Sequence, residues 1–315
     1  MANRTLTSRE KFIAIFLLVF TVIAFSFIEI IVKPVASDIA PLLLNFWRFA
    51  IGAVILLPAL FFFKSSELRS LTRGDVLRLS LIGILNIFIS MGFYALCMKY
   101  SRASTAAVLF SANPLATNFF SWLILKEAMS KERVTALTYG LVGIILLTIK
   151  ADSAVDTPLG ITAGLIAMLG FGLYTVMAKP MVEKYGGLVV FVVSTVAAVI
   201  AYLPVLYLLD LGFWPPEHTW PNLLGVGILG TGLGFFTYMK AMEYLSAGQT
   251  SYLFFFKPPL AMFLAWLLLN EKFSPSAAAG TMLIMLGILT EIKVKKQQAA
   301  ANDPPHNPPP PSQEP

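Results

Sequence analysis

The chain has 315 residues, of which 57% are hydrophobic and 13% are charged, and its formal net charge is +6. Charged residues make up about a quarter of an ordinary soluble domain, so this composition excludes that class and indicates a membrane protein. The basic residues lie in short breaks between apolar runs, which argues against a nucleic-acid partner. The single cysteine, Cys97, excludes an internal disulfide framework and a Cys-based zinc site.

Ten apolar runs, separated by polar or Gly/Pro-rich breaks, predict an all-α membrane protein with ten transmembrane helices. The polar segment KYSRAS keeps the third and fourth runs apart, which disfavours a nine-span alternative. The first run lacks a small-residue cleavage site, so it is interpreted as a helix that follows a cytoplasmic segment 1–11. The predicted spans are 12–32, 40–63, 77–98, 103–125, 132–149, 159–178, 187–209, 221–241, 246–270 and 275–292.

The second half of the sequence repeats the first at a shift of 144 residues, without a gap. The coinciding positions include Tyr100 and Tyr244, Pro114 and Pro258, Trp122 and Trp266, and Glu127 and Glu271. Because five spans separate each residue from its copy, the two halves must cross the membrane in opposite senses. The sequence therefore predicts two inverted five-helix repeats, 12–150 and 159–292, joined by a linker at 151–158.

The distribution of lysine and arginine predicts the orientation of the spans. Sixteen of these residues fall in the breaks on one side of the membrane and five on the other. Since basic residues concentrate in cytoplasmic loops, both chain ends are expected in the cytoplasm of a multi-pass protein of the plasma (inner) membrane. Proline density in the final segment, 293–315, predicts a disordered cytoplasmic tail.

Several segments carry a resemblance to a known family. They are APLLLNFWRFAIGAVILLP in the second span, and YALCMKYSRASTAAVLFSANPLATNFFSWLILKEAMSKERVTALTYGLVGIILL together with its second copy. The chain resembles the EamA family of the drug/metabolite transporter superfamily over about residues 10–292. That resemblance implies an inverted-repeat carrier, commonly an exporter of amino acids, metabolites or drugs. It also implies a cavity lined mainly by spans other than the fifth and tenth.

Lys257 lies midway along the ninth predicted span and is followed by Pro258 and Pro259. An ammonium at the bilayer centre costs about 2.5 to 3.5 kcal/mol on insertion scales, so we expect Lys257 to face a wet cavity inside the bundle. There it would bind a carboxylate or phosphate of the substrate, or titrate. The alternative is a permanent salt bridge to Glu29 that only holds helices together.

Two further charged residues lie inside spans, Glu29 in the first and Arg48 in the second. Glu29 is a candidate proton carrier for coupled transport, or else the residue that neutralises Arg48 at a similar depth. Arg48 is a candidate substrate ligand, or else an anchor for Glu29. Asn113 is the copy of Lys257 and precedes Pro114. It is expected to approach the same site, or else to make an interhelical hydrogen bond.

Aromatic residues in the spans could line a cavity for an amphipathic or aromatic substrate, although helical spacing fits packing equally well. The candidates are Tyr94, Tyr174, Tyr238, Tyr252, Trp47 and Phe256. Pro114 and Pro258 interrupt two equivalent helices and are candidates for gating, with Glu29 for coupling. No metal site and no cofactor are expected.

These features together predict a secondary active transporter, an exporter or exchanger that works by alternating access around a midplane cavity. The substrate would be a small organic metabolite with an anionic group, such as an amino acid, and the lipid bilayer would be the other partner. One alternative is a membrane-embedded enzyme acting on lipids or isoprenoids, and another is a non-transporting partner protein. The only histidines, His218 in a loop and His306 in the tail, make the enzyme less favoured. Oligomeric state is not predicted.

Overall fold

The computed structural model describes residues 7–126, 156–251 and 256–271, together with Phe254 and isolated residues between 131 and 143 and between 278 and 286. The predicted spans 132–149 and 275–292 and the linker lie mostly outside the described residues, and the tail lies wholly outside them. These predictions are therefore untested.

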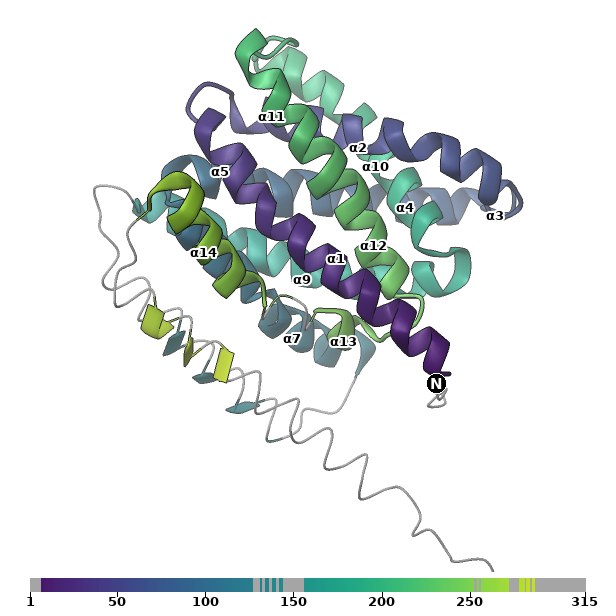
Figure 1. The fold of residues 1–315 in the computed structure, drawn as a ribbon. Helices are drawn as coiled ribbons and strands as arrows, with labels where there is room; N and C mark the ends of the chain where they lie inside the picture. Colours follow the sequence, from purple (N-terminus) through teal and green to yellow (C-terminus); the bar gives the residue numbers. More distant parts are fainter. Residues whose placement is uncertain are drawn as a thin grey trace, which may run out of the picture.

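Every regular element in the described part of the chain is helical (Figure 1). The α-helices are α1 (Ser8–Val32), α2 (Pro41–Phe63), α3 (Ser65–Arg69), α4 (Arg73–Ile84), α5 (Met91–Tyr100), α6 (Ala103–Ser111), α7 (Asn113–Leu125), α9 (Pro158–Tyr185), α10 (Gly187–Leu208), α11 (Trp220–Gly225), α12 (Gly234–Ala241), α13 (Ala247–Ser251) and α14 (Lys257–Leu269). Two 3₁₀ turns, η1 (Lys33–Val35) and η3 (Glu217–Thr219), and two π-helical segments, η2 (Leu85–Ser90) and η4 (Val226–Leu233), complete the set.

Seven helical stretches within the described residues are long and apolar enough to cross a membrane. They coincide with the predicted spans one to four and six to eight, and α14 is a shorter apolar helix in predicted span nine. Large apolar side chains on their outer surface, such as Phe12 and Phe62, are exposed. An apolar exterior of this kind suits hydrocarbon rather than water, so the chain is a multi-pass membrane protein.

The sixth span is longer than predicted, because α9 continues seven residues beyond 178 to Tyr185. Lys179 and Lys184 had suggested an earlier end. Instead, Lys179 donates to backbone carbonyls and Lys184 pairs with Asp75 at 3.1 Å, so neither charge breaks the helix. Gly186, with φ of 82°, ends it in a conformation that favours glycine.

The bundle has two ends, which are named after Asp38 and Glu67 in the connections between its helices. The Asp38 end contains the α1–α2 connection, and the Glu67 end contains the α2–α4 connection. The chain alternates between them, so the loop from 209 to 219 also lies at the Asp38 end. There, His218 Nε2 lies 2.9 Å from Asp38 Oδ2.

The π-helical segment η4 is rich in glycine. Its glycines pack against α1 and α2. A Cβ added to Gly52 of α2 would lie 3.0 Å from the Gly232 backbone nitrogen, and one added to Gly230 would lie 2.6 Å from Ile28. The close packing is therefore present, and larger residues at these positions would separate the helices.

Two membrane-crossing stretches are interrupted at equivalent places. Pro114 is in the first turn of α7 after the break at Ala112, and Pro258 is in the first turn of α14 after the break at Phe256. Both helices have 13 residues. Both end at a residue with φ of 54°, Lys126 and Asn270 respectively. Two half-helices thus begin inside the bundle, where proline supplies a favourable first turn.

Several tertiary contacts recur at the spacing of the sequence repeat. Lys33 Nζ donates to the carbonyls of Met98 and Ser101. Lys179 Nζ donates to the carbonyls of Met242 and Leu245, at 2.7 and 2.9 Å, and these residues lie 144 positions after Met98 and Ser101. Helix α1 packs against α12 and α14, which flank it in Figure 1, and α9 packs against the corresponding α5 and α7. The two halves therefore use the same contacts.

Candidate functional site

An ion pair lies at the centre of the described bundle. Lys257 Nζ, at the start of α14, is 2.5 Å from Glu29 Oε1, in the C-terminal part of α1, and neither side chain has exposed surface. Of the two expectations for Lys257, a wet cavity and a salt bridge to Glu29, the structure has the salt bridge. For Glu29 the sequence left open a proton carrier and a residue that neutralises Arg48; in the structure its ion pair is with Lys257.

Tyr94 of α5 joins both members of the pair. Its hydroxyl donates to Glu29 Oε1 and accepts from Lys257 Nζ at 3.1 Å. The Lys257 ammonium also lies 5.2 Å from the centre of the Tyr94 ring and 4.9 Å from that of Phe110. Aromatic faces attract a cation, so these rings stabilise an ammonium that water does not reach.

Arg48 is the third buried charge. Its Nε donates to Thr231 Oγ1 at 3.0 Å, and the side chain has no exposed surface. Arg48 interacts electrostatically with Glu29, Tyr94 and Tyr202. Its two terminal nitrogens, Nη1 and Nη2, have no hydrogen-bond partner among the described residues. Buried guanidinium donors are normally paired, so this fork is a candidate anion-binding group.

The second half holds a neutral counterpart of this cluster. Thr175 Oγ1 of α9 and the Tyr238 hydroxyl of α12 lie 3.0 Å apart, and Tyr238 is 144 residues after Tyr94. Tyr174 is also buried, and its hydroxyl lies 3.9 Å from the Met239 sulfur. Tyr174 and Tyr238 thus belong to the packed interior, together with the Phe171 ring, which lies 5.6 Å from each.

Asn113 lies at the first position of α7, as Lys257 does in α14. Its side-chain nitrogen donates to the Phe110 carbonyl at 2.9 Å, while its buried Oδ1 has no hydrogen-bond partner among the described residues. Phe110 therefore contacts both Asn113 and Lys257, which brings the two equivalent helix starts to one aromatic residue.

Three of the predicted lining residues are not found in this cluster, and one of them lies outside the described residues. Trp47 lies towards the Asp38 end, where its Nε1 donates to the Phe213 carbonyl at 2.8 Å and its ring contacts those of Trp214 and Trp220. Its side chain secures the loop from 209 to 219. Tyr252 lies outside the described residues, and Phe256 is exposed.

Two buried polar residues near Arg48, Asn45 and Tyr202, were not predicted from the sequence. Asn45 Nδ2 donates to the Ile87 carbonyl at 2.5 Å and to the Tyr202 hydroxyl at 3.1 Å. Asn45 Oδ1 has no hydrogen-bond partner in the described part of the chain. The signal was present, because Asn45 is a polar residue three positions before Arg48 and therefore on the same side of α2.

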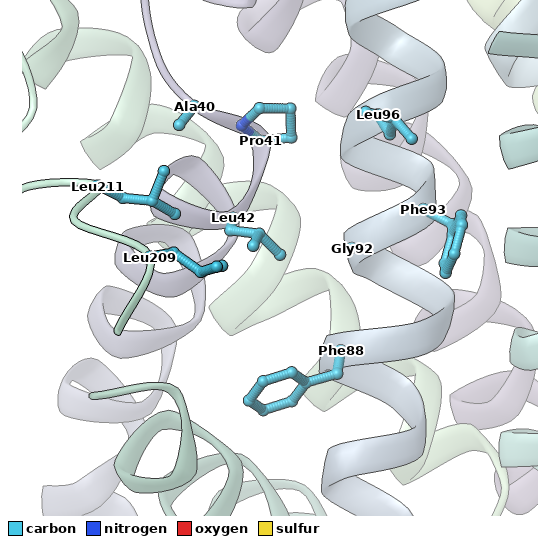
Figure 2. Close-up of a pocket in the computed structure, with 9 residues that line it drawn as sticks. All are labelled: Ala40, Pro41, Leu42, Phe88, Gly92, Phe93, Leu96, Leu209 and Leu211. Atoms are coloured by element: carbon cyan, nitrogen blue, oxygen red, sulfur yellow. The ribbon is translucent and has the colours of Figure 1, made fainter. Parts of the chain in front are cut away.

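A cavity of about 440 Å³ lies between the start of α2, the η2–α5 stretch and the loop after α10 (Figure 2). Phe88, Gly92, Phe93 and Leu96 form one wall, and residues 40–42, Leu209 and Leu211 form the rest. All of its lining side chains are apolar. The cavity adjoins the polar cluster through Phe88, whose ring stacks on that of Tyr202 with centres 3.9 Å apart.

The described cluster offers buried charged groups that can bind a charged solute. Among the described residues there is no group of three or more His, Cys, Asp or Glu side chains that could hold a metal ion. Lys257 and Arg48 contribute two positive charges and Glu29 one negative charge, so the centre has a formal charge of +1. A multi-pass helical protein with such a centre has the properties of a membrane carrier.

Comparison with known proteins identifies the group. The family model described as the EamA-like transporter family matches residues 12–149 and 158–290, and the chain belongs to this family. It is 34% identical to an uncharacterized transporter of Clostridium kluyveri, over 79% of this chain and 82% of that protein. A probable terminal-alkyne amino-acid exporter of Streptantibioticus cattleyicolor is 24% identical, over 59% of this chain and 63% of that protein.

A solved crystal structure has the same fold, with a TM-score of 0.70 at 20% sequence identity, over 90% of this chain and 98% of that chain. Because the chain belongs to the EamA-like transporter family and its relatives are named transporters, the protein is a transporter rather than a membrane-embedded enzyme.

Proposed function

We propose that this protein is a secondary active carrier, an exporter or exchanger, of a small organic solute with an anionic group, and that amino acids are the favoured class. The observation that carries the proposal is the unbalanced positive charge at the buried centre. Glu29 offsets one of the two cations, and the terminal nitrogens of Arg48 are unpaired among the described residues. Burying such a donor group without a partner is unfavourable, so a bound anion would stabilise it.

The positions of α7 and α14 support an anionic ligand. Both half-helices begin inside the bundle, at Asn113 and Lys257, and a helix N-terminus carries a partial positive charge. Carriers with interrupted helices use such termini to attract anionic substrate groups. We assign Arg48 as the ligand for the anion, with Lys257 and Asn113 beside it.

An amino group on the same solute would find a matching acceptor. Glu29 Oε2 is buried and has no hydrogen-bond partner among the described residues, while Oε1 is occupied by Lys257 and Tyr94. A zwitterion could therefore place its carboxylate on Arg48 and its ammonium near Glu29. The relative named as an amino-acid exporter agrees with this class.

We further propose ten helices in two inverted repeats, with both chain ends in the cytoplasm of the plasma membrane. The family model matches the chain twice, and the contacts of Lys33 recur at Lys179. The excess of basic residues on one side supports the orientation.

Alternating access would then rock the halves around the buried centre. Pro114 and Pro258 would allow the interrupted helices to move, Tyr174 and Tyr238 would line the path, and Glu29 would couple it to protons.

The test uses purified full-length protein. A thermal-shift screen over amino acids, nucleobases and phosphorylated metabolites selects the solute, and counterflow in liposomes measures its transport. We expect an anionic or zwitterionic solute to be transported, and Arg48→Gln to weaken its binding by about 10- to 100-fold, as expected for a charge-assisted hydrogen bond.

Arg102→Gln is the matched control, since Arg102 lies at the Asp38 end beside Asp156 and is partly exposed. That variant should transport normally. Transport limited to cations or neutral solutes, or unaltered binding in Arg48→Gln, would contradict the proposal.

A further inference from the structure

We propose that the apolar cavity beside α2 and α5 is a second subsite, which takes the apolar chain of the solute whose anionic group binds Arg48. This inference rests on the proposed function and adds a substrate class to it, namely anions or zwitterions with an unbranched hydrocarbon chain. The cavity, of about 440 Å³, has only apolar side chains in its lining. Apolar walls next to a few polar groups are typical of a site for an amphipathic ligand.

The cavity and the charged centre lie at successive levels along α2. Leu42 lines the cavity, Asn45 follows it by three residues, and Arg48 follows by three more. Each step of three residues joins neighbours on the helix, and the six residues together span about 9 Å along its axis. A solute with its carboxylate at Arg48 therefore reaches the level of the cavity with a hydrocarbon chain of about seven carbon atoms.

Only a thin layer of side chains separates the two places. Phe88 lines the cavity and stacks on Tyr202, whose hydroxyl accepts a hydrogen bond from Asn45. Gly92 lines the cavity too, and a Cβ built on it would lie 3.7 Å from the Tyr202 hydroxyl. Rotation of the Tyr202 and Phe88 rings would join the cavity to the centre.

The boundary also carries unpaired polar atoms. Asn45 Oδ1 and, about one turn further along α2, Arg48 Nη1 and Nη2 are buried without hydrogen-bond partners in the described residues. Buried amide and guanidinium groups are normally paired, so these atoms indicate a ligand with polar atoms near them. This observation is independent of the cavity.

The cavity is not a necessary result of the repeated fold. At the repeat spacing of 144 residues, Gly92 corresponds to Phe236 and Leu96 corresponds to Lys240. A phenyl ring and a charged chain thus occupy the equivalent positions of the second half. The first half instead leaves space, and does so on the same helix, α2, that carries Arg48.

The experiment measures binding of straight-chain 2-amino acids and the corresponding straight-chain carboxylates, from about four to about twelve carbons, to purified full-length protein by calorimetry. We expect affinity to rise by about fourfold for each methylene that enters the cavity, until the cavity is filled, which is the gain from burying that group. A flat series would overturn the inference, because the cavity would then take bilayer lipid or no ligand.

Variants at Gly92 separate the cavity from general effects. A Cβ there meets its neighbours at 3.6 to 3.9 Å, an ordinary contact, so Gly92→Ala should fold. Thermal unfolding of Gly92→Leu checks that the larger side chain leaves the protein folded. We expect Gly92→Leu to abolish the gain with chain length while four-carbon ligands bind as before, and Gly92→Ala to reduce it by about one methylene. Gly74→Leu, at an exposed site in α4, is the control and should keep the full gain.

The two proposals fail in different ways. Binding that depends on Arg48 but not on chain length would overturn the apolar subsite and keep the anionic site. Chain-length dependence that persists undiminished in Gly92→Leu would place the apolar chain elsewhere and overturn the assignment. No binding by any member of either series would overturn the subsite and contradict the favoured amino-acid class.

Discussion

Lys257 and Glu29 form an ion pair in which each charge lies at the less favourable end of its own helix. The ammonium is at the N-terminus of α14, the positive end of the helix dipole, and the carboxylate is in the last turns of α1, near the negative end. A pair that only connected helices would be more stable with the charges exchanged. The ion pair therefore offsets an unfavourable position of each charge within its own helix.

Removing one member of this pair should destabilise the protein. We expect Lys257→Met to lower the free energy of unfolding by about 3 to 5 kcal/mol, because Glu29 is left buried and unpaired. The double variant Lys257→Met/Glu29→Gln should recover most of that loss, since no charge remains unpaired. Denaturant unfolding in detergent measures both.

Transport separates stability from function in the same variants. The double variant should stay folded but fail to transport an anionic solute. Normal transport by the double variant would limit the pair to a structural role.

The hydroxyl of Tyr94 should matter more than that of its counterpart Tyr238. Tyr94→Phe removes a hydrogen bond to charged groups, which is worth about 1.5 to 3 kcal/mol, and retains the ring beside Phe110. Tyr238→Phe is the matched control, because its hydroxyl bonds only the neutral Thr175 in the described structure, and should lose about 0.5 to 1.5 kcal/mol. Equal losses in thermal unfolding would argue against a special role for Tyr94.

The contact between α4 and α10 depends on a glycine. A Cβ added at Gly83 would lie 2.0 Å from the Ser194 carbonyl oxygen, and neither backbone can move without separating the helices. We expect Gly83→Ala to destabilise the protein by about 3 kcal/mol or more. Gly74→Ala, whose Cβ would be 3.9 Å from Thr72, should fold normally. Similar unfolding temperatures for the two variants would contradict this packing.

The contact between the Asp38 carboxylate and His218 should be lost in acid. Hydrogen bonds from Ser37 and His218 lower the pKa of Asp38 below its ordinary value. A lowered carboxyl pKa stabilises the contact above the ordinary aspartate range, and the contribution is lost as the pH falls through the folded pKa. The fluorescence of Trp47 and Trp214, which lie at the same end of the bundle, should change when the contact between Asp38 and His218 is lost.

Ser37→Ala removes the largest cause of the lowered pKa, so the fluorescence change should occur at a higher pH than in the unaltered protein. An unchanged midpoint would show that Ser37 does not hold the Asp38 carboxylate.

Hydropathy predicted the locations of the long helices well, because a lipid environment requires a continuous apolar run at each crossing. The interruptions were also visible, since Pro114 and Pro258 lack a backbone N–H and fit the first turn of a helix better than its interior. The π-helical segment η4 was not, because its backbone depends on how Gly230 and Gly232 pack against neighbouring helices.

The candidate site was predicted in part. Lys257, Glu29, Tyr94 and Arg48 were singled out because charge or a polar ring is rare inside a span, and the structure places them together. Their pairing was less predictable. Lys257 reaches Glu29 only because α14 packs against α1, a contact between helices that are far apart in the chain.

The formal charge of +1 at the buried centre has an electrical consequence. An empty carrier that turns this charge from one side of the membrane to the other moves it through the transmembrane field, which acts with about 2.3 kcal/mol per charge for each 100 mV. A carrier occupied by a monoanion would be neutral at the same place and would turn without that work. On the proposed function, the voltage across the cell membrane acts chiefly on the unloaded return step when the solute is a monoanion, which favours swapping one solute for another. A zwitterion adds no net charge, so the voltage would then act equally on the loaded and the unloaded steps.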